Sequence, residues 1–279
     1  MIAIAEQLEV VRPRRLKEAL VALAEAAGAG APLTPMAGGT DLFVGLNAGA
    51  PSPSRYLDLW RLDELRGIER DGRRLRFGAL TTFSDCIRSH AVEKLLPILV
   101  AAAREVGGVQ IQNRGTLAGN IGNGSPAADG VPVLLAAEAQ VILASTQGER
   151  AVPLADFYTG YRKTVRRPDE LIARIELTAQ KGEQRFRKVG TRAAQAISKV
   201  VLAATGLGGK TPRIALGSVA PTVVRARKLE SFLAAGGRDE DGAARAILED
   251  VRPIDDVRST AEYRTRVCAN LARELVRGI

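Results

Sequence analysis

Residues 33–46 read LTPMAGGTDLFVGL, and they decide how the first part of the chain folds. The pattern predicts a short strand, a turn at the two glycines, and a helix that starts near Thr40. Glycine permits positive φ and lets a ligand approach the main chain, and free amides at a helix start can hold a phosphate. Steric packing of the turn alone would also explain the glycines. The Asp41 carboxylate should point away from a phosphate bound here, because like charges repel.

A second glycine-rich stretch, RGTLAGNIGNGSPAAD at 114–129, lies in a segment, 107–130, that we predict to be irregular. An irregular loop of this length is usually functional or mobile. Thr116 and Asn120 can hydrogen-bond a phosphate or a ribose, and Asp129 can accept a bond from a ribose hydroxyl. Alternatively, the asparagines cap turns and Asp129 caps the next helix. Two separate cradles favour a dinucleotide ligand over a mononucleotide.

The remainder of the chain divides into two parts with different patterns. In the first 170 residues we predict helices at 13–27, 91–106 (with a possible kink at Pro97) and 131–138, and strands at 55–59, 73–80 and 139–146. Four β-like runs follow, at 170–178, 185–192, 196–205 and 213–220, and then three helical stretches, near 226–235, 239–250 and 260–277. Strands followed by helices are typical of a separate α+β domain with an antiparallel sheet. A polar break places the domain boundary near 176–182.

The composition limits the chemistry that the chain can perform. The 279 residues are 46% hydrophobic, enough for a substantial core. Two distant cysteines, Cys86 and Cys268, exclude a disulfide scaffold and an iron–sulfur cluster held within this chain, which needs about four thiolates. The single histidine, His90, is most simply interpreted as an exposed residue at a helix C-terminus. The histidines that hydrolase triads and multi-histidine zinc sites require are therefore missing. We predict no catalytic side chain and no metal site, and we expect a bound organic cofactor to carry the chemistry.

The net charge of +9 raises the question of nucleic-acid binding. The arginines are scattered, however, and no aromatic residues interleave with them to stack bases. A solvated surface or docking onto an acidic partner explains them better. No apolar run reaches the roughly 18 residues that span a bilayer, and the first residues lack the charge order of a secretory signal. We therefore expect a cytoplasmic protein that binds neither nucleic acid nor membrane.

Several segments resemble the FAD-binding medium subunit of the xanthine dehydrogenase family, which includes the flavoprotein subunits of carbon monoxide dehydrogenase and related molybdenum hydroxylases. The segments are PMAGGTDL (35–42), GTLAGNIGNGSPAAD (115–129), FYTGYRKTVRRPDELI (157–172), FRKVGTRAAQAISKV (186–200), RIALGSVAPTVVRARKLE (213–230) and PIDDVRSTAEYR (253–264). The resemblance implies an α+β protein of the vanillyl-alcohol-oxidase flavoprotein type. Residues 1–178 would form an FAD-binding domain of two α/β subdomains, about 1–55 and 56–178. Residues 179–279 would form an α+β C-terminal flavoprotein domain with an antiparallel sheet and helices.

The resemblance also implies which residues bind FAD, with both glycine loops holding its pyrophosphate through backbone amides. The matching positions are Pro35, Met36, Ala37, Gly38, Gly39, Thr40, Asp41, Leu42, Thr116, Leu117, Ala118, Gly119, Asn120, Asp129, Ile172 and Lys188. Asp129 matches an adenosine-ribose position, whereas Ile172 and Lys188 match positions that line the flavin. A lysine near the flavin N1/C2=O edge would stabilise the reduced flavin, although Lys188 could also be a surface residue on a strand.

Three neighbouring positions bear on this expectation. Tyr158 or Tyr161 could pack on the isoalloxazine edge or in the core. Val106 departs from relatives that carry an aromatic residue near the flavin, which puts that contact in doubt. No cysteine-rich insertion is present, so FAD would be the only redox centre of the chain.

By resemblance, the chain would pass electrons from two [2Fe–2S] clusters on a small partner subunit through FAD to NAD or another acceptor. A large molybdopterin subunit would complete a heterotrimer or its dimer. Two alternatives stay open: a stand-alone FAD-dependent reductase of the same fold, and a cofactor-free scaffold. The arginines at 162, 166 and 167 are a hypothetical docking face for the iron–sulfur subunit.

Overall fold

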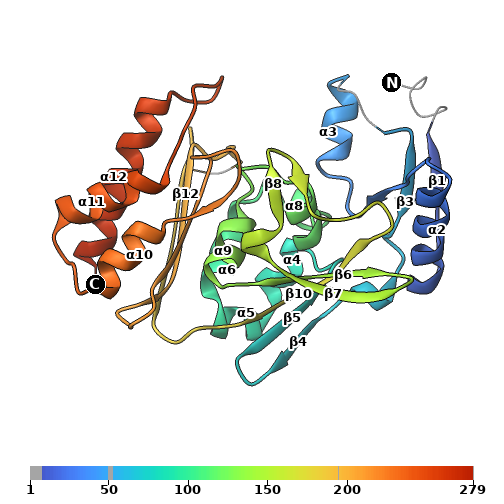
Figure 1. Cartoon of the computed structure of the whole chain (residues 1–279), viewed down its shortest axis with the longest axis horizontal. Coiled ribbons are helices and arrows are strands. Elements are labelled where there is room, and N and C mark those ends of the chain that lie inside the picture. The colour runs from blue at the N-terminus through green and yellow to red at the C-terminus, as the bar shows by residue number, and fades with distance from the viewer. Residues whose placement is uncertain (1–7, 50–52, 194, 279) are drawn as a thin grey trace.

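The structure is a computed structural model that describes residues 8–49, 53–193 and 195–278. Three parts follow one another along the long axis of the molecule, with the N-terminal part and the C-terminal helices at opposite ends (Figure 1). No helix in the described part of the chain combines the length and the apolar character needed to cross a bilayer.

The N-terminal part is a small parallel sheet covered by a helix. Its elements are β1 (Glu9–Val11), α2 (Leu16–Gly28), β2 (Thr34–Met36), α3 (Leu42–Asn47) and β3 (Arg55–Asp58). The strand order is β1-β3-β2, and both pairings are parallel. Helix α2 buries the apolar face that the 13–27 pattern predicted. The sheet extends through Asp58, so the predicted subdomain boundary near residue 55 falls on β3 rather than beside it.

The central part is a five-stranded antiparallel sheet in the order β4-β5-β10-β6-β7. Its strands are β4 (Ile68–Asp71), β5 (Arg74–Gly78), β6 (Gln140–Ser145), β7 (Gly148–Pro153) and β10 (Leu171–Thr178). In β5, buried Leu75 and Phe77 alternate with exposed arginines, as expected of a sheet with one face on the core. A small hairpin of β8 (Tyr158–Gly160) and β9 (Lys163–Thr164) leads into β10. Two single 3₁₀ turns, η1 (Asp63–Leu65) and η2 (Leu154–Asp156), complete the connections.

Six helices lie between β5 and β6, and three predictions need correction among them. The helices are α4 (Phe83–Arg88), α5 (His90–Leu95), α6 (Pro97–Glu105), α7 (Val109–Gln112), α8 (Leu117–Gly122) and α9 (Gly130–Ala136). The helix predicted at 91–106 is in fact α5 and α6, because Pro97 has no amide to continue α5 and starts α6 instead. The irregular conformation predicted for 107–130 is wrong at α7 and α8, whereas residues 113–116 and 123–129 between and after these helices are irregular as predicted. His90 starts α5 and is exposed, rather than ending a helix.

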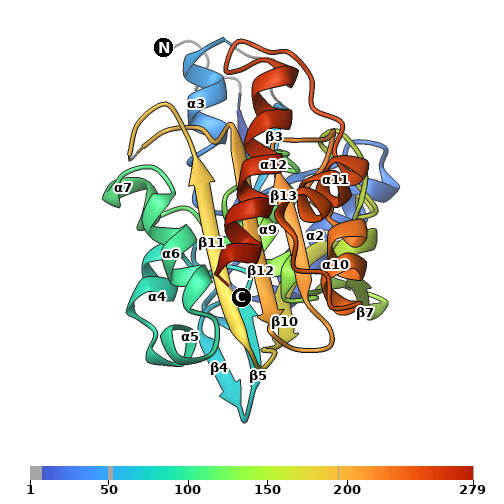
Figure 2. The same ribbon diagram turned by 90° about the vertical axis from the view of Figure 1, so that its left-hand side faces the viewer.

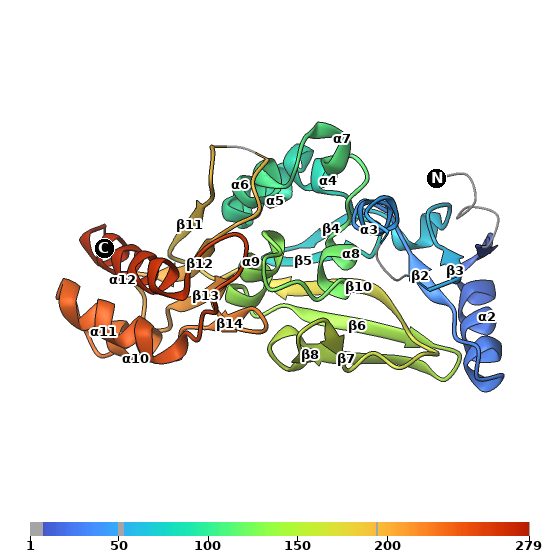
Figure 3. The same ribbon diagram turned by 90° about the horizontal axis from the view of Figure 1, so that it is seen from above.

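The C-terminal part is an antiparallel sheet covered by three helices, as the sequence predicts, but its four strands are not the four predicted runs. The run at 170–178 is β10 of the central sheet, and the short strand at residues 224–225 was not predicted. The elements of this part are β11 (Glu183–Val189), β12 (Val200–Leu207), β13 (Arg213–Gly217), β14 (Val224–Arg225), α10 (Arg227–Ala234), α11 (Glu240–Asp250) and α12 (Ala261–Arg277). Every residue of β12 is buried, because α12 crosses one face of the sheet (Figure 2) and α9 packs against the other (Figure 3). The C-terminal sheet is therefore in direct contact with the helix that follows the second glycine-rich stretch.

Candidate functional site

The first loop, residues 37–41, connects β2 to α3 and has backbone groups free to bind a ligand. Gly39 has φ of 74°, a conformation that favours glycine, and a Cβ atom there would lie 2.8 Å from the Phe43 ring. The amides of Gly38, Gly39 and Thr40 donate to no other residue that the structure describes. Helix α3 starts at Leu42 rather than near Thr40. Of the other predicted site residues in this segment, Pro35 and Met36 belong to β2 and Ala37 follows it.

The first loop packs directly on the start of the second loop, residues 114–129. A Cβ atom at Gly38 would overlap the backbone carbonyl of Arg114, so only glycine lets the two segments meet here. The Arg114 guanidinium lies 3.7 Å from the centre of the Trp60 ring, and the Arg66 guanidinium lies 4.6 Å from the same ring. These cation–π contacts fix the start of the second loop against the N-terminal part of the protein.

The second loop offers fewer free amides than the sequence suggested, because much of it is helix α8. The Leu117 amide donates to Thr81 O (3.0 Å). The Gly119 amide donates to the Thr116 hydroxyl (3.0 Å), and the Asn120 amide donates to Thr116 O (2.9 Å). Thr116 thus caps α8 by accepting a bond at its buried hydroxyl oxygen, and the O–H proton of this hydroxyl can still donate to a phosphate.

The side chains of this helix also divide into core and site residues. Leu117 and Ala118 are buried in the core, so they can face a cofactor only through their backbone. The amides of Thr116 and Ala118 donate to no other residue in the described part of the chain. Ile172, in β10, is buried and lies close enough to α8 that a Cβ atom at Gly122 would be 3.8 Å from its Cδ1 atom. The contribution of α8 to a site therefore comes from a few amides and from Asn120.

Two buried oxygen atoms of the second loop, Asn120 Oδ1 and Asp129 Oδ1, have no hydrogen-bond partner among the described residues. Asp129 precedes α9, but its side chain makes no capping bond, so its alternative interpretation as a helix cap is wrong. Buried polar atoms almost always have a partner, and leaving one unsatisfied costs about 1–3 kcal/mol. Both oxygens can accept hydrogen bonds from the hydroxyl or N–H groups of a ligand.

Lys188, in β11, forms a buried ion pair with Asp129. Its side chain is 3% exposed, and its Nζ donates to Asp129 Oδ2 (2.8 Å) and to Glu105 O (3.0 Å). Lys188 is therefore not a surface lysine. Burial raises the pKa of Asp129 to about 6; the Lys188 ammonium opposes this rise, and the Glu105 carboxylate adds to it.

The ion pair joins two residues that the resemblance assigns to different ends of FAD. Asp129 was expected at the adenosine ribose and Lys188 at the flavin, which are opposite ends of FAD. In the structure, Lys188 Nζ and Asp129 Oδ2 are 2.8 Å apart. Val106, the position where some relatives carry an aromatic residue, directly follows Glu105, whose carbonyl holds Lys188.

The hairpin of β8 and β9 also contacts both loops, a role that the sequence did not reveal. The Tyr158 hydroxyl donates to Ile121 O (3.0 Å). At the tip, Arg162 donates to Asn123 Oδ1 (2.9 Å) and lies 3.7 Å from the Asp41 carboxylate. The Asp41 carboxylate is thus held by an arginine at the hairpin. Arg162 has φ of 54°, which is uncommon for a residue other than glycine and cannot be read from the sequence.

Comparisons with known proteins match this architecture from end to end. A family model described as the FAD binding domain in molybdopterin dehydrogenase matches residues 6–179, and one described as the CO dehydrogenase flavoprotein C-terminal domain matches residues 185–279. The chain belongs to the FAD-binding medium subunits of the molybdenum hydroxylase family. Among the relatives of this medium subunit is the carbon monoxide dehydrogenase medium chain of Hydrogenophaga pseudoflava. The two are 32% identical over 97% of this chain and 96% of the relative.

Other relatives and solved structures agree. The xanthine dehydrogenase FAD-binding subunit of Escherichia coli O157:H7 is 31% identical over 86% of each chain. A structure of carbon monoxide dehydrogenase from Hydrogenophaga pseudoflava has a TM-score of 0.88 at 28% identity, covering 96% of this chain and 95% of that one. Quinoline 2-oxidoreductase from Pseudomonas putida 86 has a TM-score of 0.87 at 26% identity, covering 97% and 96%. The medium subunit is an oxidoreductase subunit that binds FAD.

The arginines predicted as a docking face of the medium subunit have partners within their own chain. Arg166 donates to Arg167 O (3.0 Å) and Glu170 O (2.7 Å), and burial lowers its pKa. Arg167 pairs with the buried Glu170 carboxylate at 3.0 Å. These two side chains hold the segment before β10 together, while Arg162 and Arg167 remain 47% and 55% exposed.

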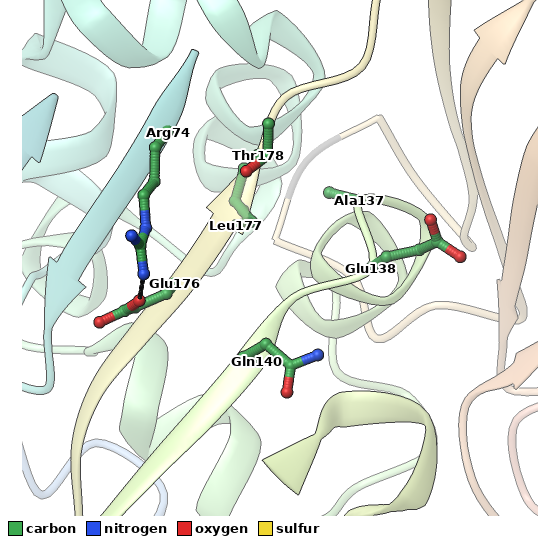
Figure 4. Close-up of a pocket in the computed structure, with 7 residues that line it drawn as sticks. All are labelled: Arg74, Ala137, Glu138, Gln140, Glu176, Leu177 and Thr178. Carbon is green, nitrogen blue, oxygen red and sulfur yellow. Dashed lines mark hydrogen bonds and ion pairs between the residues drawn. The ribbon is translucent and has the colours of Figure 1, made fainter. Parts of the chain in front are cut away.

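A surface recess of about 310 Å³ lies elsewhere on the medium subunit (Figure 4). Its lining contains none of the predicted cofactor residues; it consists of Arg74, Ala137, Glu138, Gln140, Glu176, Leu177 and Thr178. Arg74 is paired with Glu176, as Figure 4 shows, and Glu138 accepts a bond from Arg213 at 2.8 Å. These charges are already satisfied within the protein, so the recess gives no indication of a second ligand.

Proposed function

We propose that the chain is the electron-transfer subunit of a molybdenum hydroxylase, receiving electrons from [2Fe–2S] clusters on a small partner subunit. NAD or another acceptor would take them, and a large molybdopterin subunit would complete a heterotrimer or its dimer. The observation that carries the proposal is the pair of buried, unpartnered oxygens, Asn120 Oδ1 and Asp129 Oδ1, in a chain that two flavoprotein family models cover. We retain a cytoplasmic location as a prediction.

Three groups of residues would hold FAD. The amides of Gly38, Gly39 and Thr40 would bind its diphosphate, since oriented backbone amides neutralise such charge without a lysine. The predicted backbone contacts of residues 35–37 and 41–42 would extend this group. In the second loop, the free amides of Thr116 and Ala118 would contribute, because those of Leu117, Gly119 and Asn120 already donate within the chain. Asn120 Oδ1 and Asp129 Oδ1 would accept hydrogen bonds from hydroxyl or N–H groups of the cofactor.

The chain itself would supply binding, orientation and electrostatics rather than a reacting side chain. FAD, when bound, supplies the exchange between one-electron and two-electron transfer. The ion pair of Lys188 and Asp129 would set the electrostatic environment of the cofactor. Burial of both side chains strengthens their influence, because water screens them less.

The proposal is tested first on the purified chain and then on its complex. The absorption spectrum should show a flavin, and heat should release FAD from a protein that contains no iron. A co-purified complex with its two partner subunits should then reduce the bound flavin when substrate is added without oxygen. A flavin that stays oxidised while the iron–sulfur clusters become reduced would contradict the electron-transfer role. A chain that is colourless and refuses added FAD would instead favour a cofactor-free scaffold.

A further inference from the structure

A short turn, residues 125–129, carries Asp129 between α8 and α9. Within the turn, the Ala127 amide donates to the Ser125 hydroxyl and the Ala128 amide donates to Ser125 O, both at 3.2 Å. These bonds leave the carbonyls of Pro126 and Ala127 without a partner inside the turn. The position of the turn, and therefore of Asp129, depends on what these two carbonyls contact.

Both carbonyls are held by serines of the C-terminal part. The Ser218 amide donates to Pro126 O (2.7 Å), and the Ser198 hydroxyl donates to Ala127 O (3.3 Å). The two serines also contact each other: the Ser218 hydroxyl donates to Ser198 O (3.1 Å), and the two hydroxyl oxygens are 3.0 Å apart. Each hydroxyl proton thus has an acceptor, and both serines are buried.

Ser218 adopts a strained conformation to make these contacts. Its φ is 65°, in the region that favours glycine. The preceding residue, Gly217, packs so closely on the turn that a Cβ atom would lie 3.1 Å from Pro126 O. Strained backbone of this kind persists where the contacts around it are strong enough to hold it, which is often the case at functional sites.

We propose that Ser198 and Ser218 are positioning residues of the cofactor site. They fix the turn at 125–129 so that Asp129 meets Lys188 and keeps its Oδ1 atom directed toward FAD. The inference rests on the proposed binding of FAD by Asp129. On this proposal, the C-terminal part of the chain contributes to the FAD site through Ser198 and Ser218 as well as through Lys188.

The test compares wild type with Ser198→Ala, Ser218→Gly and the double variant. Glycine keeps the positive φ and the amide at 218, so Ser218→Gly removes the side chain with its hydroxyl and leaves the backbone bond to Pro126 O in place. Ser145→Ala is a matched control, because Ser145 is a buried serine of β6 whose hydroxyl bonds only to its own turn. FAD affinity is measured from pH 5 to pH 8 by quenching of the fluorescence of Trp60, the only tryptophan. The single variants keep the test usable should the double variant not fold.

We expect the double variant to bind FAD about tenfold more weakly than wild type, since two buried hydrogen bonds are lost. We also expect the affinity to depend on pH with a midpoint below 6, because a loosened turn admits water to Asp129 and removes the burial that raises its pKa. Ser145→Ala should match wild type in both respects. Weaker binding with an unchanged midpoint would show a merely structural role and overturn the inference. Serine variants that bind like wild type would overturn it while leaving the proposed function intact, whereas a wild-type chain that binds no FAD would overturn both.

Discussion

The affinity of the protein for FAD should depend on pH through Asp129. In the free protein, burial raises the pKa of this carboxyl to about 6 from an ordinary value of 3.8. A hydroxyl or N–H group of FAD that donates to Asp129 Oδ1 favours the ionised form, so the pKa is lower in the complex. Binding of FAD then releases a proton below pH 6. Affinity therefore rises with pH through about 6 and levels off near pH 7.

The size of the effect follows from the fraction of Asp129 that is ionised in the free protein. With a pKa of about 6, roughly nine-tenths of the molecules carry the charge at pH 7, and about one in eleven does so at pH 5. If only the ionised form accepts the bond, Kd increases about tenfold between pH 7 and pH 5. A hydrogen bond to a charged acceptor contributes about 1.5–3 kcal/mol, which is enough to support a change of this size.

Asp129→Asn provides the comparison, because asparagine has nearly the same shape and does not titrate. We expect this variant to bind FAD about tenfold more weakly than wild type at pH 7, with no change between pH 5 and pH 8. Its curve should approach that of wild type near pH 5. Titration of Trp60 fluorescence with FAD at each pH gives both curves, and calorimetry at two pH values counts the proton released. A wild-type Kd that is the same at pH 5 and pH 7, or an equal slope in the variant, would refute the reasoning.

Three further predictions follow from the same contacts. Lys188→Met should raise the pKa of Asp129 above 6, because the ammonium group that opposes the rise is lost. In the same titration, the increase of FAD affinity with pH should then occur at higher pH. Gly38→Ala should abolish FAD retention and lower Tm, because the new Cβ overlaps the Arg114 carbonyl. The control Gly28→Ala should change neither, because no atom lies within 4 Å of a Cβ placed at Gly28. Arg166→Ala should lower Tm, because the bonds of Arg166 to the carbonyls of Arg167 and Glu170 are lost. An unchanged Tm with weakened co-purification of the partner subunits would instead favour the hypothesis that the arginines dock the iron–sulfur subunit.

The sequence by itself determined the features that depend on near neighbours in the chain. The glycine turn at 38–39 follows from residues that permit positive φ, and the strands and helices after residue 170 follow from short apolar patterns. The segments that resemble the family were sufficient to predict FAD, because those residues recur in order along nearly the whole chain. The same local rules misjudged 107–130, where glycine and asparagine predicted a loop. Helix α8 forms there because buried Leu117 and the Thr116 cap offset the poor helix propensity of its glycines.

The tertiary structure alone decided what the predicted residues contact. Lys188 and Asp129 are 59 residues apart in the chain, and Ser198 lies 71 residues from the carbonyl that it holds. No local pattern encodes such pairs, since they exist only because the C-terminal sheet packs on α9 and buries both partners. That burial converts an ordinary carboxylate into one with a pKa of about 6 and leaves one of its oxygens for a ligand. The sequence therefore predicts which residues bind the cofactor, while packing between the two parts of the chain sets their charge and position.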